Sequence, residues 1–139
     1  MTDKTLYILR GVSGAGKTTL AKTLEATLPD SKAIAADDFW YLLGDGEYAF
    51  DISRLGEAHN WCKKRFLNCM NYDTKNVILH NTSTSDKEIQ PYLDLALKYD
   101  YKVVSLIVEN LHGNKSVHNV PDKTLLRQAG KLRESIKLI

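Results

Sequence analysis

Four short apolar runs divide the chain, and each is continuous rather than alternating with polar residues. They are Leu6–Leu9, Ala33–Ala36, Val77–Leu79 and Val103–Val108. Unbroken apolar runs of this length are typical of parallel strands that are covered on both faces. We therefore expect the four runs to form the strands of one buried sheet.

The segments between these runs carry apolar residues at helical spacing. The predicted helices span 18–28, 52–70, 86–98 and 122–138. Ser85 and Glu88 have the spacing of a capping box at the start of the third helix, although Pro91 offers a later first turn. Strands alternating with helices predict an α/β sandwich with a mainly parallel sheet of four to five strands.

Length and composition agree with one globular domain over 1–139. Apolar residues make up 43% and charged residues 26% of the 139 positions. No apolar run approaches the roughly 20 residues that cross a bilayer, and the first residues do not resemble a signal peptide. We therefore expect an intracellular, cytoplasmic protein without a membrane partner. Cys62 and Cys69 lie too far apart along one predicted helix to form a disulfide, at roughly 10 Å, and are expected to be buried thiols.

The net charge of +2 is distributed unevenly. Six Lys or Arg stand against two acids from Asn110 onward, whereas thirteen bases and fifteen acids precede that position. A basic tail suits phosphate-rich ligands such as nucleotides or nucleic acids, but it is equally compatible with a solvated helix face.

One motif carries most of the chemical information. Gly11-Val12-Ser13-Gly14-Ala15-Gly16-Lys17-Thr18 fits G-x-x-x-x-G-K-[ST], and it lies between a predicted strand and a predicted helix. In such a P-loop, successive backbone N–H groups and the helix N-terminus face the phosphates. Lys17 is expected to reach the β- and γ-phosphates, Thr18 to contact Mg²⁺, and the loop through Thr19 to bind ATP.

Two carboxylates follow the second strand. Parallel sheets gather their chemistry at the carboxyl ends of the strands, so Asp37 and Asp38 should lie near the P-loop. A carboxylate there can accept the proton of a hydroxyl that attacks the γ-phosphate. Adjacent side chains usually point apart, and we assign the base to Asp37 and substrate contact to Asp38.

Seven segments occur in the order seen in one family of kinases: LRGVSGAGKTTLA, AADDFW, GEYAFD, LGEAHNWCKKRF, VILHNTS, YLDLALKYDYKV and HNVPDKTL. In these segments the chain resembles the P-loop kinases of the polynucleotide 5′-hydroxyl kinase group over nearly its whole length. The resemblance implies a nucleoside-monophosphate-kinase-like fold, with Asp37 as base, Lys17 as phosphate clamp and Thr18 on the metal side. It also implies a lid at 110–118, where Lys115 stands in place of the usual arginine. Lysine supplies charge without a fork of donors, and Arg127 is the alternative source.

The chain departs from that family in two further places. The third strand ends in His80-Asn81-Thr82-Ser83, without the acidic residue that relatives often carry there. Trp40 replaces a basic residue, and either stacks on a substrate base or is simply buried. Tyr48 and Thr82 are further candidate substrate contacts, while Phe50 either lines the acceptor pocket or anchors its loop.

These observations predict transfer of the γ-phosphate of ATP to the 5′-hydroxyl of RNA or DNA. Two alternatives remain: a kinase for a small molecule on the same scaffold, and a nucleotide-binding module that has lost catalysis. The oligomeric state does not follow from the sequence.

Overall fold

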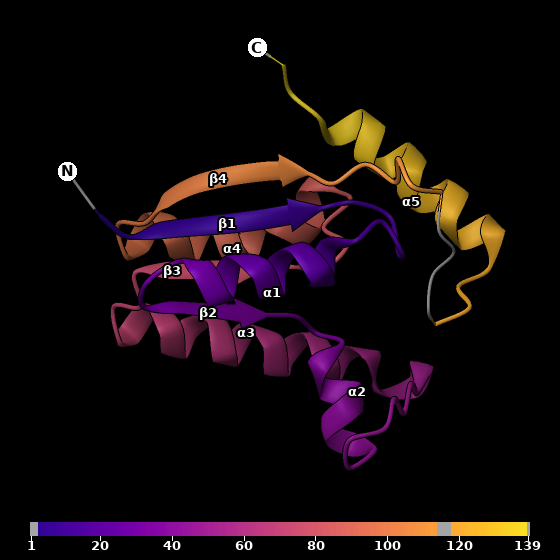
Figure 1. Ribbon diagram of the computed structural model, residues 1–139, viewed down its shortest axis with the longest axis horizontal. Coiled ribbons are helices and arrows are strands. Elements are labelled where there is room, and N and C mark those ends of the chain that lie inside the picture. The colour runs from indigo at the N-terminus through magenta and orange to yellow at the C-terminus, as the bar shows by residue number, and fades with distance from the viewer. Residues whose placement is uncertain (1–2, 114–117, 139) are drawn as a thin grey trace.

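The computed structural model describes residues 3–113 and 118–138, and its centre is a four-stranded, all-parallel sheet (Figure 1). The elements in chain order are β1 (Thr5–Arg10), α1 (Lys17–Thr27), β2 (Ser31–Ile34), α2 (Asp38–Leu43), the 3₁₀ turn η1 (Ile52–Arg54), α3 (Leu55–Asn71), β3 (Asn76–Leu79), α4 (Asp86–Lys98), β4 (Lys102–Ile107) and α5 (Asp122–Ser135). The strand order is β2-β3-β1-β4. The predicted α/β class, the parallel sheet and the four strands are confirmed.

Alternate residues of the strands supply two cores, one on each face of the sheet. The larger core contains Leu6, Ile8 and Ile34 from the strands, and α3 and α4 cover it with residues such as Phe66 and Tyr92. The smaller core joins Leu9 and Ile78 to Ala21 of α1 on the opposite face. Since both faces are covered, the middle strands read as continuous apolar runs.

Strand β4 differs from this expectation. It is an edge strand, and Val103 and Ile107 are each 38% exposed. Its apolar sequence indicated burial on both faces, but among the described residues the helices cover it only in part.

Strand β2 lies two residues earlier than the sequence indicated. The carbonyl of Asp30 already accepts a hydrogen bond from the Asn76 N–H. At the other end, the Ala36 N–H donates to the side chain of Asn81 at 2.7 Å instead of continuing the strand ladder.

The capping box predicted at the start of α4 is present. The Ser85 side chain accepts from the Glu88 N–H, and the Glu88 carboxylate accepts from the Ser85 N–H at 2.8 Å. Helix α4 therefore begins at Asp86, and Pro91 lies inside it rather than in its first turn. The capping box outweighs the proline, which removes one N–H from the interior of the helix.

Helix α2 was not predicted from the sequence. It is short, and it turns Phe39 and Trp40 into the core while Asp38 begins its first turn. Trp40 is only 1% exposed and packs edge-on against Phe39 and Phe50, with ring centroids 5.4 and 5.2 Å away. Of its two predicted roles, burial is therefore correct, and stacking of Trp40 on a substrate base is wrong.

Replacing Trp40 with alanine tests this burial. We expect Trp40→Ala to lower the free energy of unfolding by about 3–5 kcal/mol, because it empties a closed part of the core. Leu42 lies on the same helix and is 62% exposed, so Leu42→Ala should change stability by less than about 0.5 kcal/mol. Urea unfolding of the two variants measures the difference, and equal midpoints would show that Trp40 is not a core residue.

Candidate active site

The P-loop follows β1 at the carboxyl edge of the sheet, where its main chain contacts the segments that follow β3 and β4. The Gly11 N–H donates to the carbonyl of Thr82 at 3.0 Å, joining the loop to the end of β3. A Cβ atom on Gly11 would lie 2.5 Å from the Val108 carbonyl oxygen, so only glycine fits beside the end of β4. The close approach explains the first glycine of the motif.

Helix α1 starts directly from this loop. Its N-cap, Gly16, adopts a left-handed conformation with φ of 104°, and no side chain caps the first turn. The first turn also contains no acidic residue. Uncapped N–H groups at a helix start bind anions, so the residues present fit the triphosphate of ATP.

Lys17 is folded back onto the loop. Its Nζ donates to the carbonyls of Gly11 at 2.9 Å and Val12 at 2.8 Å, and its side chain is buried. Burial lowers the pKa of Lys17 to about 8, and the negative charge of Asp37 opposes this shift. The negative charge of Asp37 therefore acts on the buried Lys17 amine.

The two carboxylates after β2 have different surroundings. Asp38 forms an ion pair with Arg65 of α3, with 3.2 Å between Oδ2 and Nη1. Asp37 is exposed, and its side chain makes no capping hydrogen bond to α2. The structure thus separates the pair into an anchored carboxylate and an accessible one.

His80 occupies the end of β3, where related kinases often carry an acid. Its Nδ1 lies 3.4 Å from the Thr18 hydroxyl. Burial lowers the pKa of His80, against the opposing charge of Asp38, and this favours the neutral imidazole. Among the described residues, no cluster of His, Cys, Asp and Glu could hold a metal ion. Thr18 as the metal-side hydroxyl remains a prediction.

Aromatic rings gather beside the carboxylates. Tyr48 stacks on the His118 imidazole, with centroids 3.7 Å apart and planes inclined by 10°. Burial and then the charge of Asp37 raise the pKa of Tyr48 to about 12. The role of Tyr48 in substrate binding remains a prediction. Phe50 is 53% exposed and contacts Trp40, so it anchors its loop while one side stays open.

For three other predicted site residues, the structure does not decide the role. The carbonyl of Thr82 holds the P-loop, and the residue also lines a pocket of about 250 Å³ between α3 and α4. Arg127 is exposed on α5. Lys115 and the middle of the predicted lid lie outside the described residues. The roles assigned to these residues remain predictions.

Three residues near the P-loop had no role in the sequence analysis. The side chain of Gln128 on α5 accepts from the Ser13 N–H at 3.0 Å, and His112 Nε2 lies 3.2 Å from the Ala15 carbonyl oxygen. Asn81 bridges the Ala36 N–H and the Cys62 sulfur, which fixes the end of β2 next to β3. Asn81 lies two residues after the predicted end of the third strand, and this position was the signal that the sequence offered for it.

Comparison with known proteins agrees with this geometry. The family model AAA_33, described as an AAA domain, matches residues 6–111. The chain belongs to this family. The AAA_33 chain is a P-loop kinase-like, nucleotide-binding domain, and the predicted kinase resemblance is confirmed at the level of family and fold.

Two relatives match this chain over only a part of their own length. Human NEDD4-binding protein 2 is 37% identical over 99 residues, which cover 71% of this chain and 6% of that protein. The 2′,3′-cyclic-nucleotide 3′-phosphodiesterase of Pongo abelii is 31% identical over 104 residues, which cover 73% of this chain and 23% of that enzyme. This chain thus spans a small part of both relatives.

Solved structures share the fold of the AAA_33 domain. A chain in the Pnkp1/Rnl/Hen1 RNA repair complex matches with a TM-score of 0.74 and 17% identity, over 95% of this chain and 45% of that one. APS kinase CysC of Mycobacterium tuberculosis matches with a TM-score of 0.55 and 13% identity, over 94% and 97% of the two chains.

Within the described residues, no helix is both long enough and apolar enough to span a membrane.

The lowered pKa of Lys17 predicts pH-dependent nucleotide binding. Phosphate stabilises the ammonium form, whereas the free protein prefers neutral Lys17 above about pH 8. The affinity for ADP in the absence of metal should therefore fall by about tenfold or more between about pH 7 and about pH 9.5.

Calorimetry in buffers with different ionisation enthalpies should detect proton uptake on binding near pH 8. Lys17→Met should bind weakly and remove the proton uptake. Affinity that stays constant over this pH range would show that Lys17 is already fully charged in the free protein.

Proposed function

We propose that this domain transfers the γ-phosphate of ATP, with Mg²⁺, to the 5′-hydroxyl of a polynucleotide. The observation that carries the proposal is the arrangement of Asp37 and Lys17. Asp37 follows β2, Lys17 follows β1, and the charge of Asp37 acts on the buried Lys17 amine. A buried lysine on the P-loop and an exposed carboxylate after β2 support the proposal, because phosphoryl transfer needs a group that holds the phosphate and a base.

The residues divide the reaction between them. The acceptor hydroxyl oxygen forms a bond to the γ-phosphorus, the bond from that phosphorus to the β–γ bridging oxygen breaks, and ADP leaves. Asp37 accepts the hydroxyl proton, while Lys17 and the P-loop N–H groups stabilise the charge on the phosphate oxygens. Thr18 is our candidate for the metal-side hydroxyl.

A second positive charge near the transferred phosphate is part of the proposal. Lys115 is one candidate. Arg127 is the other, because the neighbouring Gln128 binds the backbone of Ser13 and so brings this turn of α5 to the P-loop. Either side chain would replace the lid arginine of related kinases.

The choice of a polynucleotide as acceptor has support from the relatives. The chain of the RNA repair complex matches nearly the whole of this domain. One sequence relative is named for a reaction on cyclic nucleotides. The basic C-terminal segment and the exposed ring of Phe50 are also compatible with a nucleic acid.

The decisive assay uses γ-labelled ATP, Mg²⁺ and an oligonucleotide with a 5′-hydroxyl end, beside the same oligonucleotide already 5′-phosphorylated. Label on the hydroxyl form alone would support the proposal. Label on neither form, with ATP binding intact, would contradict it and favour a small-molecule acceptor. If a panel of metabolites were also inactive, loss of catalysis would be the better explanation.

The base assignment predicts the effect of removing one charge. Asp37→Asn should reduce transfer by about a hundredfold or more, while nucleotide affinity stays within about threefold, because only proton acceptance is lost. Asp45→Asn is the matched control, since Asp45 is exposed on the neighbouring loop and its φ of 52° suits asparagine. Transfer that survives in Asp37→Asn would assign the base elsewhere.

A further inference from the structure

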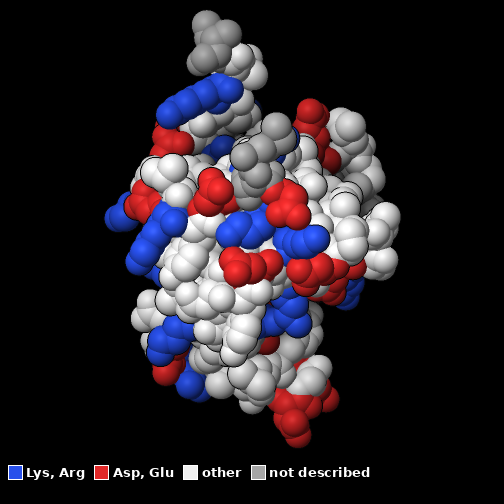
Figure 2. Space-filling view, turned by 90° about the vertical axis from the view of Figure 1, so that its left-hand side faces the viewer, with Lys and Arg blue, Asp and Glu red and all other residues white. Residues whose placement is uncertain are grey.

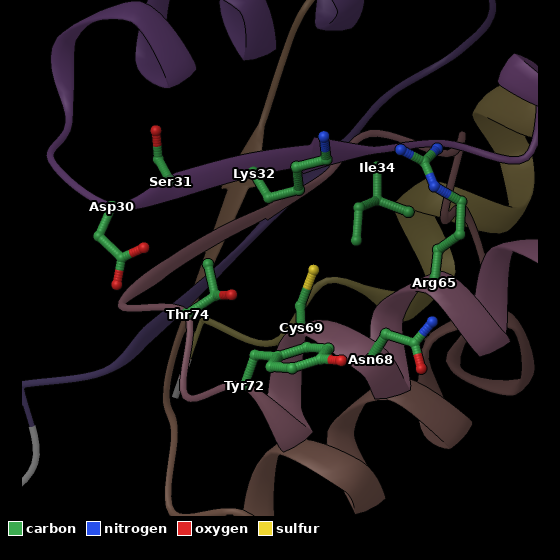
Figure 3. A pocket seen from close by; sticks show the side chains of 9 residues that line it. All are labelled: Asp30, Ser31, Lys32, Ile34, Arg65, Asn68, Cys69, Tyr72 and Thr74. Atoms are coloured by element: carbon green, nitrogen blue, oxygen red, sulfur yellow. The ribbon is translucent and has the colours of Figure 1, made fainter.

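A groove runs along the free edge of the sheet between β2 and α3. Its volume is about 430 Å³, and its lining includes Lys32, Ile34, Arg65, Asn68, Cys69 and Tyr72. Figure 3 shows Lys32 and Ile34 extending from the strand on one side, and the α3 residues facing them from the other. We call this feature the β2–α3 groove.

Arg65 connects the groove to the candidate active site. It lines the groove, and its guanidinium also binds Asp38, the residue next to the proposed base. The guanidinium carbon lies 4.7 Å from the centroid of the Trp61 ring, which supports it from the side. Arg65 therefore links the residue next to Asp37 with the lining of the groove.

Two cations, Lys32 and Arg65, and one acid, Asp30, line the groove, and Arg65 also pairs with Asp38. Burial raises the pKa of the half-buried Cys69 thiol; the charges of Arg65 and Lys32 oppose this shift, and the charge of Asp30 adds to it. Asp30 is the one acid among the described lining residues, and it lies at the far end of β2. Its carboxylate accepts a hydrogen bond from the Lys75 N–H.

The lining also includes a platform for a flat ring. Tyr72 follows the last turn of α3 and is 84% exposed. Asn68 lies one turn earlier and offers a donor and an acceptor. Positive charge along a groove, together with an exposed aromatic ring, is the combination that binds single-stranded nucleic acid without sequence preference.

A peptide strand added to the edge of the sheet is the competing occupant. The outward N–H of Ala33 already donates to the Glu25 carboxylate at 2.5 Å. This contact occupies a backbone donor that an added strand would need. The occupied donor therefore disfavours an added strand, while Lys32 and Arg65 offer cations to a phosphate-bearing ligand.

We propose that the β2–α3 groove binds the body of a single-stranded acceptor whose 5′ end lies at Asp37. The proposal rests on the proposed function and deepens it, because it makes the acceptor a polynucleotide rather than a single nucleotide. Arg65 binds a phosphate near the terminal nucleotide, Lys32 binds a phosphate further along the strand, and a base stacks on Tyr72.

The β2–α3 groove can hold only a short length of the acceptor strand. Beyond the end of the groove lies the amino edge of the sheet, where Figure 2 shows acidic and basic side chains intermixed rather than a field of one sign. Lys4 pairs there with Asp73, and Lys75 with Asp3. The track therefore accommodates a few nucleotides and ends at this edge.

The test compares oligonucleotides of two and eight nucleotides with 5′-hydroxyl ends, using the 139-residue chain. Fluorescence anisotropy should show that the octamer binds at least about tenfold more tightly than the dimer. Lys32→Ala should weaken octamer binding by about threefold to tenfold and reduce the salt slope of log K by about 0.7, the value for one phosphate of a single strand.

Tyr72 is tested separately from the charge. Tyr72→Ala should weaken octamer binding by about fivefold or more with an unchanged salt slope, and Tyr72→Phe should restore it because phenylalanine keeps the ring. ADP affinity reports on folding in each variant. Lys22→Ala is the matched charge control, because Lys22 is exposed on α1 across the sheet, and it should leave both the affinity and the slope unchanged.

The outcomes separate the two proposals. If the wild-type protein phosphorylates both oligonucleotides with equal KM and equal affinity, the groove proposal is wrong while the kinase proposal stands. If neither is phosphorylated but the octamer still binds in a Lys32-dependent manner, the kinase proposal fails and the groove remains a nucleic-acid site. Unchanged binding in both Lys32→Ala and Tyr72→Ala would place the strand elsewhere and overturn the inference.

Discussion

The main-chain contacts of Gly11 hold the P-loop in place, and the rest of the candidate active site depends on them. Its N–H binds the end of β3, its carbonyl accepts from Lys17, and its α-carbon faces the Val108 carbonyl with no room for a side chain. One residue thus fixes the P-loop against β3 and β4. The positions of Lys17, Thr18 and the start of α1 follow from it, because they continue directly from the loop.

Charge at this edge is distributed over neighbouring strand ends rather than concentrated on one. Lys17 after β1, His80 after β3 and Asp37 after β2 influence one another, and Asp38 is anchored by Arg65. A neutral imidazole beside Thr18 supplies a hydrogen-bonding partner but no negative charge.

Helix α5 completes the site by contacts that are polar rather than apolar. Arg10 is buried and donates to the Ser83 carbonyl and to the Ser135 hydroxyl at the end of the helix, while Gln128 in the middle of the helix accepts from the Ser13 N–H. Figure 1 shows α5 lying across the carboxyl ends of the strands. Two anchor points hold a helix that buries few side chains, so its hold on the P-loop depends on these hydrogen bonds.

The sequence by itself determined the parts of the protein that depend on local pattern. The apolar runs predicted the four strands, the Ser85–Glu88 spacing predicted the start of α4, and the glycine spacing predicted the P-loop. Each depends on residues close together in the chain, where backbone geometry and periodicity act directly.

Tertiary structure decided what depends on distant segments meeting. Trp40 is buried because α2 turns it into the core, and β4 is partly exposed because it became an edge strand. Only the folded chain brings Arg65 to Asp38, although 27 residues separate them. That ion pair left Asp37 as the accessible carboxylate, since long-range packing rather than residue type determines which of two adjacent acids is held.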